Sequence, residues 1–224
     1  MDSSPSQPSA TGWLSQCGPR LAAYWPVKFF GLSAGMTLFF LAYFQVLRHP
    51  LHPPLVMPLT VIDRWISFQP AALPLYLSLW FYISLAPGLL LTRREMLAYS
   101  FAAIGLGLAG LGIFLAWPTA VPPPGVTWAD NSLFAFLKAT DASGNACPSL
   151  HVAFAVFTAF ELGRLLRQMS AGRTARVLNW LWCVGILYST VATRQHVSLD
   201  VLAGTALGVA VALAHQRWLR APTS

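Results

Sequence analysis

Charged residues are scarce in this chain of 224 residues, at 9% of the sequence. Soluble domains average about 25% charged residues, so there are too few here to cover the surface of a soluble enzyme. The three cysteines, Cys17, Cys147 and Cys183, stand at unrelated spacings, which excludes a disulfide framework and a cysteine-based metal motif. Hydrophobic residues make up 56% of the sequence, and that content excludes a disordered chain.

Long uncharged runs take the place of the missing charge. Residues 96–117 and 71–91 contain no charged side chain, and as helices both are long enough to cross a hydrocarbon core of about 30 Å. The sequence therefore predicts an all-α polytopic membrane protein, a bundle of six transmembrane helices. The predicted spans are 26–47, 71–92, 95–117, 149–168, 175–195 and 197–219.

The remaining segments are predicted to lie outside the bilayer. Residues 1–22 are rich in Ser, Pro, Gln and Gly, which predicts a disordered cytoplasmic tail before a membrane domain at 23–221. Residues 58–68 are amphipathic and are predicted to lie along the membrane interface.

Glycine motifs in the predicted spans indicate helix packing. The motif Gly105-x-Gly107-x-x-Gly110 fits a dinucleotide-binding pattern, but it lies within a span, follows no strand and has no acidic partner. Glycines four residues apart form small faces on which helices approach closely, and two pairs have this spacing: Gly31/Gly35 and Gly204/Gly208.

The basic residues are divided unequally between the two membrane faces. The formal net charge is +7, but the bases are scattered between apolar runs and form no patch for nucleic acid. Cytoplasmic loops are enriched in Lys and Arg, so both termini are predicted to be cytoplasmic. The bias towards Ala, Leu, Gly and Arg favours a bacterial inner membrane. One face would carry ten bases, namely Arg20, Lys28, Arg93, Arg94, Arg164, Arg167, Arg173, Arg176, Arg217 and Arg220, and the other Arg48, Arg64, Lys138 and Arg194.

Two polar stretches fall on the extracytoplasmic face. Residues 141–151 lead into the predicted span at 149–168, and residues 189–200 lead into the span at 197–219. Each stretch contains a histidine, His151 or His196, although histidines were not used to assign the faces. Their shared face predicts a functional site there.

The first stretch has the features of an anion site. Pro148 stands directly before a predicted helix start, and Ser149 is a suitable N-cap. The backbone N–H groups and the positive dipole end of such a helix favour a bound phosphate.

The second stretch supplies the groups for phosphoryl transfer. His196 and Asp200 are four residues apart, so on a helix they share a face, and the carboxylate could fix the tautomer of the imidazole. The other ring nitrogen would then be the nucleophile or base. Arg194 offers a forked cation for phosphate oxygens, and His151 could protonate a leaving group.

The two stretches contain the motif Pro148-Ser149-Leu150-His151 and the motif Ser189-Thr190, five residues, His196, three residues, Asp200. These two motifs resemble two signature motifs of the type 2 phosphatidic acid phosphatase superfamily. The resemblance implies that His196 forms a phosphohistidine, that Asp200 holds it, and that His151 is the general acid. It also implies that Ser149 contacts the phosphate and that neither a metal nor another cofactor is needed.

Three departures from the family pattern bear on the phosphate site. Leu150 replaces a glycine, a variant similar to inositol phosphorylceramide synthases and related bacterial proteins. Thr190, after Ser189, replaces an arginine, and Arg194 would lie one helical turn further on, about 40° round the helix. The first family motif is not recognisable near residues 117–124, and Lys138 in the same outer loop is the basic residue that could compensate.

The resulting expectation is a membrane enzyme that acts on a lipid phosphate or diphosphate, either as a phosphatase or as a phosphotransferase. One alternative is a headgroup transferase of the inositol phosphorylceramide synthase type. Others are a non-enzymatic lipid-binding or lipid-translocating protein on the same scaffold, and a small-solute transporter with a proton relay. The predicted phosphate ligands are Arg194, Ser149, Leu150, Lys138, Ser189 and Thr190.

Replacing Asp200 with asparagine tests the predicted role of the carboxylate. Asp200→Asn is expected to preserve the fold and to lower turnover strongly, because His196 loses the charge that orients it. Turnover of a lipid phosphate by the purified variant measures the effect. Near-normal rates would contradict an orienting role for Asp200.

Overall fold

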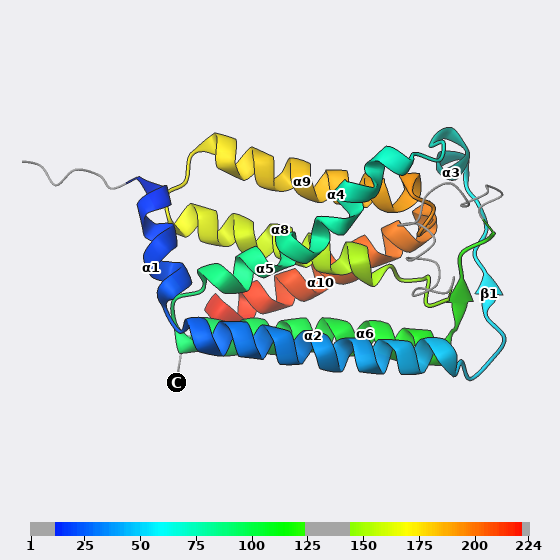
Figure 1. Ribbon diagram of the computed structural model, residues 1–224, viewed down its shortest axis with the longest axis horizontal. Helices are drawn as coiled ribbons and strands as arrows, with labels where there is room; N and C mark the ends of the chain where they lie inside the picture. The colour runs from blue at the N-terminus through cyan, green and yellow to red at the C-terminus, as the bar shows by residue number, and fades with distance from the viewer. Residues whose placement is uncertain (1–11, 124–143, 221–224) are drawn as a thin grey trace, which may run out of the picture.

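The computed structural model describes residues 12–123 and 144–220. Long helices run side by side along its longest axis (Figure 1). They confirm the predicted all-α polytopic membrane fold. The long elements are α2 (Trp25–Arg48), α5 (Leu79–Leu89), α6 (Arg93–Ala116), α8 (Leu150–Gln168), α9 (Arg173–Ala192) and α10 (Ser198–Arg220), with η2 (Pro70–Ala72) and α4 (Leu73–Leu77) leading into α5.

Five helical segments within the described ranges are long and apolar enough to cross a membrane: 25–48, 70–89, 93–116, 173–192 and 198–220. The helix α8 is not among them, so the predicted count of six is not confirmed. It carries three charged side chains, Glu161, Arg164 and Arg167. It also packs against α5, α6, α9 and α10, and these neighbours shield it. A helix enclosed by other helices does not need a wholly apolar surface.

The short elements lie at the two ends of the bundle (Figure 1). At one end, β1 (Leu55–Val56) pairs in parallel with β2 (Thr119–Ala120), close to α3 (Val61–Trp65). The other end holds η1 (Trp13–Gln16), α1 (Cys17–Ala22) and the end of α10. The starts of α8 and α10, into which the two motif stretches lead, therefore lie at the end opposite α1.

Residues 13–22 differ from the predicted disordered tail, because they form η1 and α1. The side chains of Trp13 and Cys17 pack against the apolar core. Polar contacts add to this docking: Gln16 Nε2 donates to the carbonyl of Met169 at 3.2 Å and Arg20 Nη1 to that of Leu89 at 3.1 Å. The prediction for this part of the tail was wrong, because composition alone does not reveal these contacts. Residues 1–11 lie outside the described ranges.

The contact between α8 and α10 is very close. A Cβ atom at Gly204 would overlap the carbonyl oxygen of Ser149, and one at Gly208 would lie 2.5 Å from the carbonyl oxygen of Ala153. Both positions require glycine because backbone, which cannot move aside like a side chain, occupies the space. The predicted small face at this pair of glycines is confirmed.

The other glycine motifs have separate outcomes. The Leu150 side chain fills the space beside Gly110, so this part of the 105–110 motif serves packing. The prediction for Gly31 and Gly35 was wrong, since no side chain or backbone of the described residues would come within 4 Å of a Cβ at either position. The face of α2 that bears this pair points away from the bundle.

A buried polar network joins α6, α8 and α10 in the half of the bundle away from β1 and β2. Arg164 Nε donates to Glu161 Oε2 at 3.0 Å, and its Nη1 donates to Glu95 Oε1 at 3.1 Å. His215 Nε2 lies 3.2 Å from Glu161 Oε2. Since a lone charge inside a membrane protein is costly, these groups lie where they can compensate one another.

The Gly204 contact can be tested with a single methyl group. Gly204→Ala should force α8 and α10 apart and lower the free energy of unfolding by about 1–3 kcal/mol, as overpacking does. Gly31→Ala is the matched control, because its Cβ meets open space. Thermal unfolding in detergent compares the two variants. Equal melting temperatures would contradict the close contact.

Candidate active site

The two predicted motif stretches meet at the β1–β2 end of the bundle. The backbone N–H of Ser149, just before α8, donates to the carbonyl oxygen of Asp200 in the first turn of α10 at 3.0 Å. This bond directly joins segments that lie some 50 residues apart in the sequence. The structure thus brings Ser149, His151, His196 and Asp200 into one region.

Ser149 caps α8 as the sequence predicts. Its Oγ accepts a hydrogen bond from Val152 N at 3.3 Å, and the residue is fully buried. The preceding loop is fixed to β2, where Thr119 Oγ1 accepts from Cys147 N at 2.8 Å. The first N–H groups of a helix lack partners within it, so the start of α8 can receive an anion.

His196 and Asp200 face each other across one turn. His196 Nδ1 lies 3.4 Å from Asp200 Oδ2, without the geometry of a hydrogen bond. Asp200 is fully buried, its Oδ2 accepts from Val197 N at 3.0 Å, and the His196 side chain is 13% exposed. Catalytic hydrogen bonds are often long or poorly aligned without substrate, and these two atoms are at a distance from which such a bond can form.

His196 lies on a turn between two helices. The helix α9 ends at Ala192, and the carbonyl oxygen of Thr190 accepts hydrogen bonds from Gln195 N at 3.0 Å and His196 N at 3.1 Å. Arg194 within this turn has a φ of 57°, in the left-handed region. The end of α9 therefore sets the position of His196.

The expectation that Arg194 follows Thr190 on one continuous helix was wrong, because α9 ends before Arg194. The guanidinium group donates from Nη1 to the carbonyl of Asp63 at 2.8 Å and from Nη2 to that of Ile66 at 2.9 Å. It therefore binds the backbone around α3. A phosphate contact by Arg194 stays a prediction.

The other predicted phosphate ligands have diverse surroundings. Ser189 and Thr190 are buried, and their hydroxyls donate to the carbonyls of Ile186 at 2.6 Å and Leu187 at 2.8 Å within α9. In this conformation those hydroxyl protons are not available to a phosphate. The Leu150 side chain packs against α6, which leaves only its backbone N–H for an anion. Lys138 lies outside the described residues.

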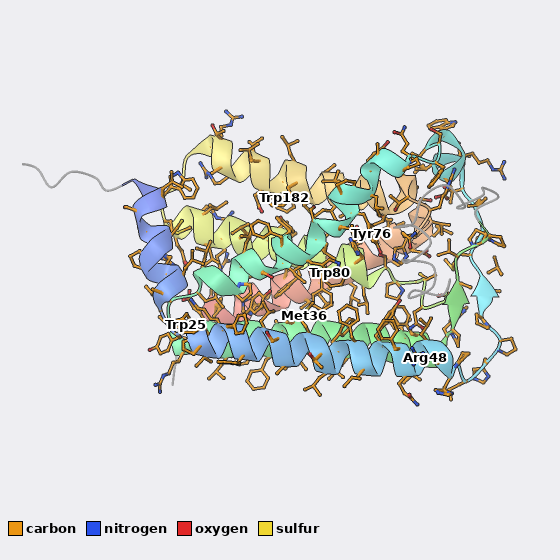
Figure 2. All side chains as sticks on the ribbon, in the orientation of Figure 1. Trp25, Met36, Arg48, Tyr76, Trp80 and Trp182 are labelled. Carbon is orange, nitrogen blue, oxygen red and sulfur yellow. The ribbon has the colours of Figure 1, made fainter. Side chains whose placement is uncertain are left out.

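An aromatic contact that the sequence analysis missed holds His151. The Tyr76 ring of α4 stacks on the imidazole with centroids 4.0 Å apart and planes 10° from parallel, and the Trp80 ring of α5 is steeply inclined to it with centroids 6.2 Å apart. Figure 2 shows Tyr76 and Trp80 on α4 and α5. The imidazole also hydrogen-bonds to the backbone of Tyr76, while its Nε2 is buried without a partner among the described residues. The bonded nitrogen is therefore Nδ1, and Nε2 is the nitrogen left for chemistry. Tyr76 and Trp80, four residues apart in the predicted span at 71–92, are the sequence feature that could have indicated an aromatic contact with a site residue.

The thiol of Cys147, in the loop before α8, is a further candidate nucleophile. Burial, together with the charge of Asp200, raises the pKa of the Cys147 thiol to about 11. Cys147 therefore stays a neutral thiol at neutral pH, and a thiol is a far weaker nucleophile than a thiolate.

The stack on His151 makes a prediction about turnover. Tyr76→Leu should lower kcat about tenfold or more, because the imidazole loses the ring that fixes its plane, and general acid catalysis contributes about 10²–10⁴-fold. Tyr76→Phe keeps that ring and is expected to stay within about threefold of wild type. Steady-state kinetics of both variants measure the difference. A leucine variant as active as the phenylalanine variant would contradict this role.

The family model described as the PAP2 superfamily matches residues 96–223, more than half of the chain, and these include both motif stretches. Neither a curated protein nor a solved structure matches the chain. The match begins within α6 and extends through α10. It therefore contains both helices that meet at Gly204 and Gly208, and the turn that bears His196. The chain belongs to the PAP2 superfamily.

Proposed function

We propose that this protein is an integral membrane lipid phosphatase or phosphotransferase that works through a phosphohistidine on His196. Membership of the PAP2 superfamily supports a phosphatase or phosphotransferase type of function. The observation that carries the finer proposal is the hydrogen bond from Ser149 N to the Asp200 carbonyl, because it holds the start of α8 beside the His196–Asp200 pair. The proposed nucleophile, its carboxylate, a second histidine and an anion-binding helix end then lie in one region of the protein.

The first half-reaction transfers the phosphoryl group to the enzyme. Nε2 of His196 attacks phosphorus while Asp200 accepts a hydrogen bond from Nδ1–H, which keeps its proton, and so holds the ring. The negative charge of the bound phosphate favours the protonated form of His151. The bond between phosphorus and the leaving oxygen breaks, and His151 gives its Nε2 proton to that oxygen. Backbone N–H groups at the start of α8 stabilise the negative charge on the phosphoryl oxygens.

The second half-reaction returns the enzyme to its starting state. The oxygen of water or of an alcohol attacks phosphorus, and the bond between phosphorus and His196 Nε2 breaks. His151 takes the proton of the attacking oxygen and is again the acid for the next cycle. Water as the acceptor makes the protein a phosphatase, and an alcohol makes it a phosphotransferase, as in the headgroup transferase alternative.

The substrate is proposed to be a lipid phosphate or diphosphate that reaches the site from the bilayer. The site lies at one end of the helical bundle, where α3 exposes Val61, Ile62 and Trp65. Such an apolar face is suited to the membrane interface, where a lipid headgroup lies. With both termini cytoplasmic, this end faces the extracytoplasmic side, and a bacterial inner membrane is the proposed location.

A specific observation favours one rival, a non-enzymatic protein on the same scaffold. The guanidinium of Arg194, the cation closest in sequence to His196, donates to two backbone carbonyls. A protein that binds lipid headgroups without chemistry has no need for a cation that stabilises a transition state. The experiment below separates this rival from the enzyme.

The test uses purified protein in phosphatidylcholine vesicles with labelled phosphatidic acid, phosphatidylglycerol phosphate and isoprenyl diphosphate, without added metal. Wild type is expected to release phosphate or to form a new labelled lipid, and His196→Ala is expected to lose the activity at least about 10³-fold. His52→Ala is the matched control, since this histidine is exposed in the loop after α2. An acid-labile label on wild type, absent from His196→Ala, would identify the phosphohistidine.

Released phosphate identifies a phosphatase, whereas a labelled lipid formed only with an added alcohol identifies a phosphotransferase. Equal activity of wild type and His196→Ala would contradict the proposed nucleophile. A lack of activity in wild type on all three lipids would favour the non-enzymatic rival.

A further inference from the structure

Asp63 is a buried carboxylate that has no role in the reaction described above. It lies in α3, in the loop between α2 and α4, and only 1% of its surface is exposed. Its flanking residues Ile62 and Arg64 are exposed, so this acid alone turns inward from a surface segment. A charged group in such a place needs several hydrogen bonds to offset the loss of water.

The carboxylate accepts four hydrogen bonds. Two come from the same segment, where Thr60 N and Thr60 Oγ1 donate to Oδ2 at 2.7 and 2.9 Å. The other two come from the start of α10, where Ser198 N donates to Oδ1 at 2.7 Å and Ser198 Oγ to Oδ2 at 2.9 Å. Asp63 therefore caps α10 from a distant part of the sequence.

The pKa of Asp63 agrees with an ionised carboxylate. Burial by itself raises this pKa, but the hydrogen bonds from the backbones and hydroxyls of Thr60 and Ser198 outweigh burial, so that the net pKa lies below its usual value. A negative charge here also interacts favourably with the positive end of the α10 dipole.

A second attachment joins the same two segments on the other side of His196. Arg194 donates to the carbonyls of Asp63 and Ile66. Ser198 follows His196 by two residues and Arg194 precedes it by two. The turn is thus fastened to residues 60–66 both before and after His196.

We propose that Asp63 is a positioning residue that fixes the turn bearing His196 and so sets the approach of His196 to Asp200. The inference rests on the proposed function, because it assigns the position of the proposed nucleophile. The bonds to Ser198 define where α10 begins, and Val197 N, one residue earlier, donates to Asp200 Oδ2. A loss of the Asp63 carboxylate would release this part of the chain while His151 and the start of α8 keep their own supports.

The variant Asp63→Asn removes the charge at nearly constant volume. Three of the four donors converge on Oδ2, and an amide NH₂ at either oxygen position would face a donor. Amide hydrogen exchange of residues 193–199 is expected to speed up about tenfold or more. With short-chain phosphatidic acid, kcat is expected to fall about 10–100-fold, as it does when residues that orient metal ligands are replaced, while KM stays within about threefold.

Arg64→Gln is the matched control. Arg64 is the next residue of α3, is exposed, and is not one of the donors to the Asp63 carboxylate. It should leave both the exchange rates and kcat within about twofold of wild type. A rise in KM with unchanged kcat in Asp63→Asn would contradict the positioning role. A fall in kcat of equal size in Arg64→Gln would contradict it too.

The outcomes separate this inference from the proposed function. Unchanged exchange at 193–199 in Asp63→Asn, faster exchange throughout the protein, or faster local exchange with normal kcat would each overturn the positioning role. Inactivity of wild type on phosphatidic acid and on the other lipids would instead defeat the proposed function. In that case the exchange rates by themselves decide whether Asp63 holds the His196 turn.

Discussion

The backbones of α8 and α10 touch at Gly204 and Gly208, and the rest of the site depends on this contact. A side chain at either position would occupy the same space as a backbone carbonyl of α8. Because the helices approach so closely at their site ends, Ser149 N can reach the carbonyl of Asp200. In a membrane, where apolar burial does not drive helices together, such close van der Waals packing is a main source of association. The same feature thus stabilises the bundle and assembles the site.

The enclosure of α8 explains how polar groups are tolerated in an apolar protein. This helix bears His151 near its start and Glu161 and Arg164 towards its end, and it packs against four other helices. Near its end Arg164 donates hydrogen bonds to Glu161 and Glu95, whereas at its start His151 has the Tyr76 ring and backbone. A lipid-facing helix could not carry these residues at similar cost. The outer helices are correspondingly apolar and are the ones that qualify as membrane spans.

The site also depends on segments outside the helical bundle. Thr119 of β2 holds the loop before α8 by its hydroxyl, and residues 60–66 hold the turn before α10. Both supports come from loops that precede the motif stretches in the sequence. A loop that bears functional residues needs a rigid support, and here short hydrogen-bonded elements supply it. This arrangement gives a physical role to residues 60–66, in the loop between α2 and α4.

The sequence by itself determined the membrane class, the positions of the long helices, the capping role of Ser149, the close approach at Gly204 and Gly208, and the nearness of the two motif stretches. The nearness of the two stretches follows from the distribution of bases between the two membrane faces, and the other features follow from hydrophobic runs, local spacing or paired glycines. Only the tertiary structure decided that residues 13–22 dock, that Gly31 and Gly35 face outward, and that α8 is enclosed. It also decided that Arg194 binds carbonyls near α3 and that Tyr76 stacks on His151. These features depend on which surfaces meet when segments distant in the sequence pack together, and neither periodicity nor spacing within one segment contains that information.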